Sequence, residues 1–488
     1  MASQSHAERS QLLESGLIIG DRVVTSTEGG SMVHVNATTG KPQKEFAIAS
    51  VDEVDEAVAA ARTAFNEWRD WQPDQRRQVL IRLADLLEQH AEEIGAISTL
   101  ETGGLFSPYN SRYAADWYRY YAGWADKLTG ESVRAYPFTG IDFTVPEPLG
   151  VAAIFVTWNG PIGFCGMAGA PALAAGCSIV IKSPELAPFS SVTFGRLCRE
   201  AGLPAGVVNV VTGGPDVGEA LVRHPDVDIV SFTGGPPTAR KLQAACAPTL
   251  KPVVLELGGK SANIVFADAD IDRTIPLATR FTGAAGQGCS LPTRLLVERP
   301  VYDEVLSRLV EGVEGVVVGD PFDPSTTMGP VISEGAATRI VGMVRDAVGD
   351  AGARLATGGN RIGGALADGF FVEPTVLADV DPTSTIAQTE VFGPVLSVIP
   401  FDDEDEALHI ANDTSYGLAA YVQTSDIARA RRMIRHLNAG NVHINASGPG
   451  PVSPASPFGG IKQSGHGRQG GREGILEFTY TKNVYIAD

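Results

Sequence analysis

The stretch LGVAAIFVTWNGPIGFCGMAGAPALAAGCSIVI, residues 149–181, carries no charged residue and is long enough to cross a membrane as one helix. Glycine and proline interrupt it repeatedly, and these residues mark turns and element ends more often than they occur inside one continuous helix. The pattern therefore predicts a buried strand, a turn, a helix and a second buried strand. A membrane span is not expected.

Short runs rich in β-branched residues alternate with amphipathic segments from Gly150 onward. The runs predict buried strands at Val151–Thr157, Ser178–Ile181, Val207–Val211, Asp228–Phe232 and Val253–Leu257. The segments between them predict helices at Ser190–Ala201, Val217–Arg223 and Pro237–Cys246. Such alternation implies parallel strands joined by right-handed crossovers, and therefore a doubly wound α/β domain that binds ligands beyond the carboxyl ends of its strands.

The rest of the 488 residues extends this into a multi-domain chain. Apolar residues at spacings of three and four predict earlier helices at Ala57–Asn66, Arg76–Ser98 and Ser111–Asp126. A second alternating region has candidate strands at Asn263–Phe266, Arg294–Val297 and Leu396–Pro400. A loop rich in Gly, Pro and Ser spans 446–456. We expect the terminal strand Phe478–Ile486 to pair with another strand, which can belong to the same chain or to another subunit.

The charge balance and the cysteines exclude several classes of protein. The formal net charge is -19 at pH 7, whereas nucleic-acid binding depends on Lys and Arg neutralising phosphates, so no nucleic-acid partner is expected. Five widely spaced cysteines without a C-x-x-C pair argue against a disulfide framework and against a zinc site. We therefore expect no bound metal. Residues 1–10 lack the apolar stretch of a signal peptide, so we expect a cytoplasmic protein with no membrane partner.

Cys289 lies in the sequence Gly-Gln-Gly-Cys-Ser, residues 286–290. A lone cysteine is usually a small buried apolar residue, and the local sequence leaves that alternative open. Glycines on both sides of Gln287 permit a tight turn and a close approach of backbone to a ligand, and the polar neighbours are not typical of a core strand. Backbone N–H groups beside such a thiol lower its pKa, so Cys289 is a candidate nucleophile.

Glu256 and Asn159 stand at the ends of predicted strands. A carboxylate inside the apolar run Val253–Leu257 is costly to bury unless it is paired or protonated. Glu256 is therefore either the partner of nearby Lys260 in a salt bridge or a general base with a raised pKa. Asn159, which precedes Gly160, is either ordinary turn chemistry or an amide donor to a developing oxyanion.

Two further segments follow predicted strands at the expected ligand edge. Lys182-Ser-Pro-Glu185 offers an ammonium donor and a carboxylate acceptor suited to ribose hydroxyls, although both charges are also typical of a solvated loop. No G-x-G-x-x-G fingerprint follows the expected strands. Instead, Ser231-Phe-Thr-Gly-Gly-Pro-Pro237 opens a helix, whose N-terminus favours phosphate and tolerates proline in its first turn.

Together these pieces resemble the aldehyde dehydrogenase superfamily, from about residue 17 to the C-terminus. The motifs that carry the resemblance are Tyr120-Tyr-Ala-Gly-Trp-Ala-Asp-Lys127, Trp158-Asn159, Lys182-x-x-Glu185, Phe232-Thr-Gly, Glu256-Leu-Gly-Gly-Lys260, Gly286-Gln-Gly-Cys289, Glu390-Val-Phe-Gly-Pro394 and Pro457-Phe-Gly-Gly-Ile-Lys462. The resemblance implies an α/β fold with two doubly wound domains and a β oligomerisation arm. It places the coenzyme-binding domain at 1–127 and 149–257, the catalytic domain at 258–463 and the arm at 128–148 and 464–488. The arm would assemble a homodimer or a homotetramer.

The resemblance also implies a reaction, the NAD(P)-dependent oxidation of an aldehyde to a carboxylic acid. Cys289 would attack the aldehyde, and the Asn159 amide and the Cys289 backbone N–H would hold the resulting oxyanion. Glu256 would then activate water to hydrolyse the thioester. Relatives that transfer the acyl group to coenzyme A generally lack this carboxylate, so Glu256 favours the free acid.

For the cofactor, the resemblance places Lys182 and Glu185 at the adenosine ribose, Glu390 at the nicotinamide ribose and Phe392 beside the nicotinamide. The full set of implied cofactor-binding residues is Thr157, Trp158, Lys182, Ser183, Glu185, Phe232, Thr233, Gly234, Gly235, Leu257, Glu390 and Phe392. Because Glu185 would repel a 2′-phosphate, NAD is favoured, with NADP as the second option.

Three departures from the family pattern bear on affinity and substrate. Gly235-Pro-Pro237 replaces a common Ser and its neighbours, so phosphate contact would rely more on backbone and water. Gly160 and Met167 stand where many members carry an aromatic residue, which would widen the substrate route. Gln469 replaces a common carboxylate and would change the organisation of water near the thioester.

We therefore expect a bulky apolar or aromatic aldehyde as the substrate. Tyr113 and Trp117 would add aromatic surface, and the loop 446–456 would form part of the mouth. The alternatives are a semialdehyde dehydrogenase, with Arg112 and Arg119 recruiting a carboxylate, a coenzyme-A-acylating dehydrogenase, or a non-catalytic structural or binding protein on the same fold. The retained nucleophile, base and oxyanion donor argue against the last, because binding alone needs none of them.

Overall fold

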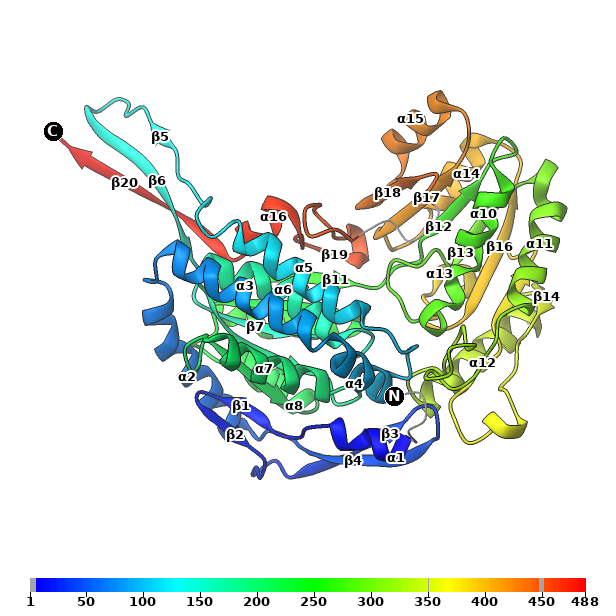
Figure 1. Cartoon of the computed structure of the whole chain (residues 1–488). Coiled ribbons are helices and arrows are strands. Elements are labelled where there is room, and N and C mark those ends of the chain that lie inside the picture. The colour runs from blue at the N-terminus through cyan, green and yellow to red at the C-terminus, as the bar shows by residue number, and fades with distance from the viewer. Residues whose placement is uncertain (1–5, 350, 447–451) are drawn as a thin grey trace.

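The computed structural model describes residues 6–349, 351–446 and 452–488. Two α/β lobes lie side by side, and a long β arm projects from the first of them (Figure 1). Of the predicted loop 446–456, residues 447–451 lie outside the described residues. The predicted α/β fold is confirmed.

The first lobe is built on an eight-stranded sheet in the order β19-β11-β10-β7-β8-β9-β1-β2. Its five central strands are parallel: β7 (Val151–Phe155), β8 (Ser178–Ser183), β9 (Val208–Thr212), β10 (Ile229–Gly234) and β11 (Val253–Leu257). Three short strands complete the edges in antiparallel pairings: β1 (Leu17–Ile19), β2 (Arg22–Val24) and β19 (Gly465–His466). All five predicted strands of this region are confirmed, with ends that shift by one or two residues.

Helices cover both faces of this sheet (Figure 1). They are α2 (Val51–Trp68), α3 (Pro73–Gln89), α4 (Ala91–Thr102), α5 (Tyr109–Ala122), α6 (Pro161–Ala175), α7 (Phe189–Ala201), α8 (Pro215–Arg223) and α9 (Pro236–Cys246). The uncharged stretch 149–181 forms β7, α6 and β8, as predicted. Within the described ranges no helix has the length and apolarity to cross a membrane.

The prediction of one helix over Arg76–Ser98 is wrong. The chain ends α3 at Gln89 and starts α4 at Ala91, because His90 has non-helical torsions (φ -93°, ψ 14°). Apolar residues continue at helical spacing across the break, with Leu83, Leu87 and Ile94 all buried. A periodicity that continues in this way cannot reveal a change of helix axis.

The second lobe has a seven-stranded sheet in the order β14-β15-β16-β13-β12-β17-β18. Its strands are β12 (Ala262–Val265), β13 (Arg294–Glu298), β14 (Arg354–Thr357), β15 (Thr375–Ala378), β16 (Val395–Phe401), β17 (Ala419–Gln423) and β18 (Asn441–Ile444), all parallel except the pair β14–β15. Its helices are α10 (Ile271–Ala278), α11 (Tyr302–Glu314), α12 (Glu334–Gly349), α13 (Thr385–Gln388), α14 (Glu404–Asn412) and α15 (Ile427–His436). A 3-10 segment, η3 (Thr279–Gly286), precedes Cys289.

The arm is a three-stranded antiparallel sheet of β5 (Ser132–Val133), β6 (Gly140–Pro148) and β20 (Thr479–Ala487). The terminal strand therefore pairs inside its own chain. The smaller elements are a hairpin of β3 (Ser31–Asn36) and β4 (Lys41–Ala47), with α1 (His6–Arg9) and α16 (Gly471–Leu476). The division into coenzyme, catalytic and arm domains stays a proposal; the short strand β19 adds to the first sheet, whereas β20 belongs to the arm.

Candidate active site

The carboxyl ends of β7, β10 and β11 open onto a cavity of about 200 Å³. Its lining joins segments that are far apart in the sequence: Thr157, Trp158, Asn159, Phe164, Thr233, Gly234, Gly235, Glu256, Leu257, Gly258, Cys289, Glu390 and Phe392. The three predicted catalytic residues therefore share one cavity.

Cys289 stands just after a strained turn. Ala284, Ala285 and Gly286 have consecutive positive φ angles of 50°, 51° and 73°. Side chains other than glycine rarely adopt this region, so the two alanines are held there by their surroundings. A Cβ on Gly286 would lie 2.0 Å from the carbonyl oxygen of Gly393, so only glycine fits at this position.

The Cys289 side chain is partly exposed, whereas the other four cysteines are buried, and all five are free thiols. Burial raises the pKa of the Cys289 thiol to about 12, and the nearby carboxyl groups of Glu390 and Glu256 add to the shift. The backbone N–H groups of Ser290 and Cys289 lower this pKa, as the sequence predicted, but burial outweighs them. In the unliganded chain the thiol is therefore protonated at neutral pH.

Asn159 follows β7 and joins the two lobes at the nucleophile. Its Nδ2 donates to the carbonyl oxygen of Gln287 at 2.9 Å. Gln287 is held on its other side, because its Oε1 accepts from the Ile332 backbone N–H at 2.8 Å. An amide nitrogen carries two hydrogens, so Asn159 retains one for a ligand in the cavity.

Glu256 is the fourth residue of β11 and is only 4% exposed. Neither carboxyl oxygen has a hydrogen-bond partner in the part of the chain that the structure describes. Oε1 lies against the backbone of Gly459, where an added Cβ would be 2.7 Å away. Burial raises the pKa of Glu256 well above its ordinary value, Arg468 opposes this shift and Glu477 adds to it. Within the described residues Glu256 forms no salt bridge with Lys260, so that alternative is wrong.

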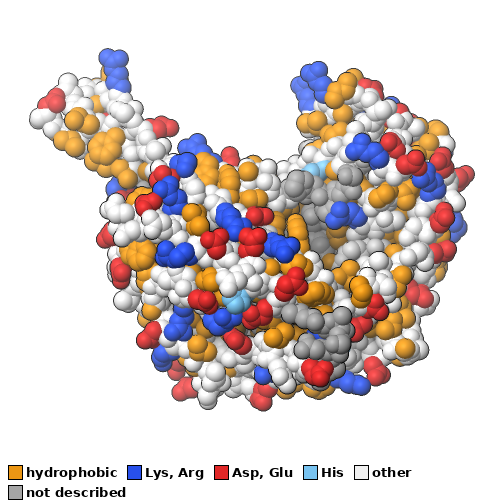
Figure 2. Space-filling model, in the orientation of Figure 1, with side chains coloured by type: hydrophobic (Ala, Val, Ile, Leu, Met, Phe, Trp, Pro, Cys, Tyr) orange, Lys and Arg blue, Asp and Glu red, His pale blue; other side chains and the backbone are white. Residues whose placement is uncertain are grey.

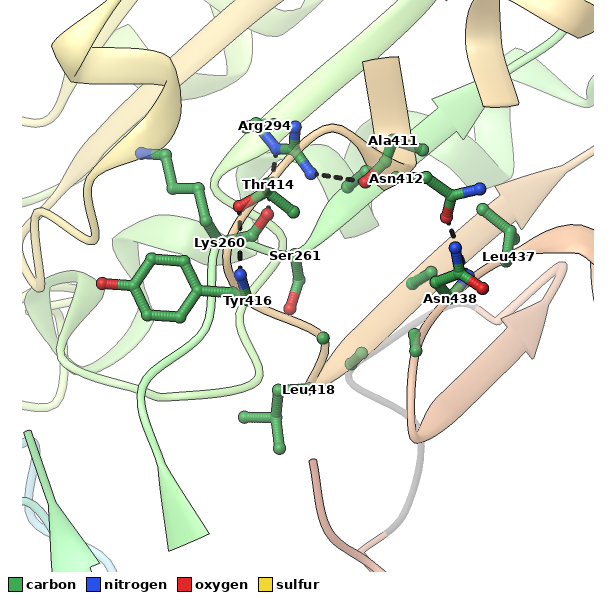
Figure 3. Close-up of a pocket in the computed structure, with 15 residues that line it drawn as sticks. Lys260, Ser261, Arg294, Ala411, Asn412, Thr414, Tyr416, Leu418, Leu437 and Asn438 are labelled. Carbon is green, nitrogen blue, oxygen red and sulfur yellow. Dashed lines mark hydrogen bonds between the residues drawn. The ribbon is translucent and has the colours of Figure 1, made fainter. Parts of the chain in front are cut away.

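Lys260 is itself buried, with 1% exposure and no hydrogen-bond partner for its Nζ among the described residues. Burial lowers the pKa of Lys260 to about 7, Arg294 adds to this shift and Glu390 opposes it. In Figure 3 its side chain extends away from Asn412 and Asn438, while its carbonyl accepts from Arg294 at 2.9 Å. The small cavity drawn there has room for about one water molecule, so it is no substrate site.

Eight of the twelve predicted cofactor-binding residues line the large cavity; the four that do not are Lys182, Ser183, Glu185 and Phe232. Lys182 lies in β8 and Glu185 follows this strand; the two side chains form an ion pair with an N–O distance of 3.1 Å. The Ser183 hydroxyl is buried and donates to the Pro188 carbonyl at 3.3 Å. Phe232 is 7% exposed and packs in the core.

Glu390 lies near the segment that links the two sheets. One of its oxygens accepts from the Gly259 N–H at 3.0 Å. Burial raises the pKa of Glu390 to about 7, and Lys260 and Arg339 oppose the shift. Arg339, on α12, was missed by sequence reasoning; it lies 51 residues before Glu390, and no local motif marks it.

The N-terminus of α9 borders the cavity but offers few donors. Pro236 and Pro237 occupy its first two positions and have no N–H group. The next two N–H groups, of Thr238 and Ala239, both donate to the Gly235 carbonyl at 3.1 Å. A phosphate group at this end would therefore meet a weaker donor array than a helix N-terminus usually supplies.

The substrate side of the cavity differs from the sequence prediction at two positions. Phe164, which sequence reasoning missed, lines the cavity and lies 3.7 Å from where a Cβ on Gly160 would stand, so it fills part of the space that Gly160 leaves. Trp117 adds no exposed aromatic surface, because it is fully buried. Tyr113 is partly exposed and lies against Gly163, where an added Cβ would be 3.5 Å from its ring.

Gln469, the third departure, is 3% exposed, and neither of its side-chain polar atoms has a partner among the described residues. Its backbone pairs with Phe458 through hydrogen bonds of 2.6 and 2.8 Å. A neutral amide at this position places no additional charge near the site. No group of His, Cys, Asp and Glu side chains in the described ranges could hold a metal ion.

A doubly wound sheet whose carboxyl edge opens onto a thiol, a buried and a half-buried carboxyl group and an amide is compatible with an oxidoreductase that binds a dinucleotide. The family model described as the aldehyde dehydrogenase family matches residues 24–484. The chain belongs to the aldehyde dehydrogenase family, whose enzymes are NAD(P)-dependent oxidoreductases.

Individual relatives agree over nearly the whole length. The chain is 42% identical over 461 residues to (Z)-2-((N-methylformamido)methylene)-5-hydroxybutyrolactone dehydrogenase of Acinetobacter baylyi, with 93% of each chain covered. It is 40% identical over 476 residues to an aldehyde dehydrogenase of Emericella nidulans, covering 96% of this chain and 94% of the relative. Among solved structures, the NAD⁺ complex of betaine aldehyde dehydrogenase from Staphylococcus aureus matches with a TM-score of 0.95 at 34% identity, over 98% of this chain and 97% of that one.

Proposed function

We propose that this enzyme oxidises a bulky apolar or aromatic aldehyde to the carboxylic acid, through a thiohemiacetal on Cys289 and a thioester that water hydrolyses. The observation that carries the proposal is the shared cavity of Cys289, Glu256 and Asn159 at the carboxyl edge of the first sheet. A nucleophile, a buried carboxyl group and a free amide hydrogen supply the three functions that covalent aldehyde oxidation needs.

In the first half of the reaction, the Cys289 sulfur attacks the aldehyde carbon and its proton leaves. With a pKa of about 12 the thiol needs a proton acceptor, and Glu256 is the carboxyl group of the cavity without a hydrogen-bond partner among the described residues. The remaining Asn159 amide hydrogen and the Cys289 N–H donate to the oxyanion. When bound, NAD(P) would supply the hydride acceptor, and loss of the hydride from the adduct would leave an acyl thioester on Cys289.

Before the second half, Glu256 releases the proton of the thiol to solvent. Glu256 then takes a proton from water, and the resulting hydroxide attacks the thioester carbonyl. Sulfur leaves as the Cys289 thiolate, which regains its proton from Glu256, and the carboxylic acid is released. Because burial holds the pKa of Glu256 well above its ordinary value, this carboxylate is a stronger base than an exposed glutamate. The presence of Glu256 favours water over coenzyme A as the acyl acceptor.

For the cofactor, we propose NAD in preference to NADP. Lys182 near the end of β8 and Glu185 just beyond it form an ion pair whose ammonium and carboxylate suit two adjacent ribose hydroxyls. A 2′-phosphate would bring negative charge against Glu185. Thr233, Gly234 and Gly235 would contact the pyrophosphate, and the edge-to-face rings of Trp158 and Phe392, 5.4 Å apart, would border the nicotinamide.

The substrate proposal rests on aromatic rings at the cavity. Phe164 lines it, and Tyr113 continues a row of rings along α5, 5.9 Å from Tyr109, which is 64% exposed. Rings of this kind bury apolar or aromatic acyl groups. The relative from Acinetobacter baylyi is named for a substituted hydroxybutyrolactone. Of the two arginines considered for a semialdehyde, Arg119 is already paired with Asp85 and Glu88 and does not support that alternative.

We also propose that the arm joins copies of the chain into a homodimer or a homotetramer. Figure 2 shows hydrophobic side chains gathered on the arm. Those with the largest exposed fractions are Tyr136 (91%), Phe138 (70%), Ile141 (63%) and Ile486 (52%). Light scattering of a Phe138→Ser, Ile141→Ser variant tests this proposal, because an unchanged mass would exclude the arm as the interface.

NADH absorbance during aldehyde turnover tests the reaction. The wild type and Cys289→Ala are compared with NAD and NADP, over a panel of straight-chain, branched and aromatic aldehydes, with and without coenzyme A. We expect turnover with NAD, a free-acid product and no activity in Cys289→Ala. Undiminished oxidation by that variant would refute the covalent mechanism, an obligatory acyl-CoA product would refute hydrolysis, and a marked preference for acetaldehyde would refute the bulky substrate.

A further inference from the structure

The turn that carries Cys289 is not fixed by its own sequence. Gly286 and Gly288 flank Gln287, and glycine leaves a backbone its full conformational freedom. Ala284 and Ala285 are held in a region of positive φ that costs free energy. The position of Cys289 therefore depends on contacts from outside the turn.

Two side-chain hydrogen bonds bracket Cys289. On its N-terminal side, Asn159 donates to the Gln287 carbonyl at 2.9 Å. On its C-terminal side, the Tyr421 hydroxyl donates to the Ser290 carbonyl at 3.0 Å. Tyr421 belongs to β17 and is fully buried, so its hydroxyl is an anchor that solvent does not loosen.

His443 braces the Tyr421 ring from the neighbouring strand. The two residues are directly paired in the parallel ladder of β17 and β18, and their rings stack with centroids 4.8 Å apart and an interplanar angle of 22°. Burial lowers the pKa of His443, so the ring that stacks at neutral pH is uncharged. Leu277 and Ala419 enclose Tyr421 in the same small cluster. Nothing in the catalytic scheme above uses either ring.

We propose that Tyr421 and His443 are positioning residues of the nucleophile turn. The Tyr421 hydroxyl fixes the Ser290 carbonyl, and the His443 ring fixes Tyr421, so the Cys289 backbone N–H stays directed at the oxyanion. This inference rests on the proposed function, in which that N–H is one of two oxyanion donors. Neither ring is among the residues that line the large cavity.

The test compares two reactions of the same thiol without cofactor. Hydrolysis of p-nitrophenyl acetate passes through an oxyanion, whereas alkylation by iodoacetamide does not. We expect Tyr421→Phe to slow acylation by the ester about tenfold or more, because a displaced donor loses much of the effect of a removed one. Alkylation should change less than threefold. In aldehyde turnover kcat should fall while the KM for NAD stays within twofold.

The matched variants separate positioning from general damage. His443→Ala should slow ester acylation about threefold to tenfold, and His443→Phe, which keeps a stacking ring, should restore it to within twofold of the wild type. Tyr302→Phe removes a hydroxyl on α11 that donates to Asp379, and neither residue lines the cavity, so both reactions should stay unchanged. Melting temperatures confirm that each variant is folded.

The outcomes also separate this inference from the proposed function. Cys289→Ala must first lose turnover, ester acylation and alkylation; if it keeps turnover, the proposed function fails. If Cys289→Ala is inactive but Tyr421→Phe acylates at the wild-type rate, only the positioning role is overturned. Equal losses of acylation and alkylation in Tyr421→Phe would also overturn it, because they indicate a changed thiol rather than a misplaced donor.

Discussion

Replacing Gly235 by Ser should tighten NAD binding about tenfold. Gly235 caps α9 with extended torsions (φ -86°, ψ 147°) that serine adopts without strain. An added Cβ meets one neighbouring atom, the Pro237 Cδ at 3.7 Å, which is an ordinary contact. The side chain therefore enters the cavity without displacing anything.

The size of the effect follows from the missing donors. Pro236 and Pro237 supply none, and the N–H groups of Thr238 and Ala239 are already bonded to the Gly235 carbonyl. A serine hydroxyl adds one hydrogen bond to a charged phosphate oxygen, which contributes about 1.5–3 kcal/mol. We take the lower end, because the hydroxyl also gives up its water, and about 1.4 kcal/mol corresponds to a tenfold change in Kd.

Titration calorimetry with NAD measures the change directly. Gly214→Ser is the matched control: Gly214 caps α8 before Pro215, no atom lies within 4 Å of its added Cβ, and it does not line the cavity. We expect tighter binding for Gly235→Ser, wild-type affinity for Gly214→Ser, and kcat at saturating NAD within twofold for both. Unchanged or weaker NAD binding by a normally folded Gly235→Ser would refute the argument that donors limit affinity here.

Three further predictions concern buried carboxyl groups. Glu256→Gln should slow thioester hydrolysis about 10²–10⁴-fold and should also slow the first release of NADH, because Glu256 accepts the Cys289 proton; a stopped-flow burst of NADH at the wild-type rate would contradict that role. Glu390→Gln should accelerate alkylation of Cys289 about threefold to tenfold at pH 9 but not at pH 6. Burial raises the pKa of Glu390 to about 7, so its negative charge opposes formation of the thiolate only above that pH. Equal alkylation rates of the variant and the wild type at pH 9 would contradict this. Burial raises the pKa of Glu101 from 4.5 to about 8, so its contribution to stability is complete below pH 4.5 and is lost as the pH rises towards 8. Glu101→Gln should therefore remove a fall in unfolding free energy of about 4 kcal/mol between pH 5 and 8, measured by urea denaturation, and an unchanged slope would contradict the shift.

Much of the fold could be predicted from the sequence because its signals are local. The buried strands β7 to β11 are short apolar runs between turn residues, and their limits were predicted within one or two positions. The break at His90 was missed because apolar spacing continues across it. Trp117 was placed on the correct helix but on the wrong face, since its neighbours along α5 are aromatic on both the cavity side and the core side.

The residues of the site also differ in whether local sequence signals could predict them. Cys289, Glu256 and Asn159 each stand in a recognisable motif, so their meeting in one cavity could be expected. The sequence could not predict that Glu256 has no hydrogen-bond partner among the described residues, because Lys260 is only four positions away. The direction of the Lys260 side chain depends on packing that no local sequence pattern shows. The bond from Tyr421 to Ser290 joins residues 131 positions apart, and no spacing rule connects them.

The segment that crosses between the sheets explains why the two lobes form one site. It leaves β11 after Leu257 and passes between Glu390 and Cys289: a Cβ on Gly258 would lie 2.0 Å from the Glu390 carboxyl group, and one on Gly259 would lie 2.7 Å from the Cys289 carbonyl. Only bare backbone fits there, and it is used, because the Gly259 N–H donates to Glu390. The fully buried Ser464 locks the crossing by donating to the Gly258 carbonyl at 2.7 Å and accepting from the Gly417 N–H at 3.0 Å. The nucleophile turn takes one anchor from Asn159, which follows β7, and another from Tyr421 on β17, so a shift between the lobes would pull Cys289 from both sides; the hydrogen bonds of Ser464 at the glycine crossing oppose such a shift.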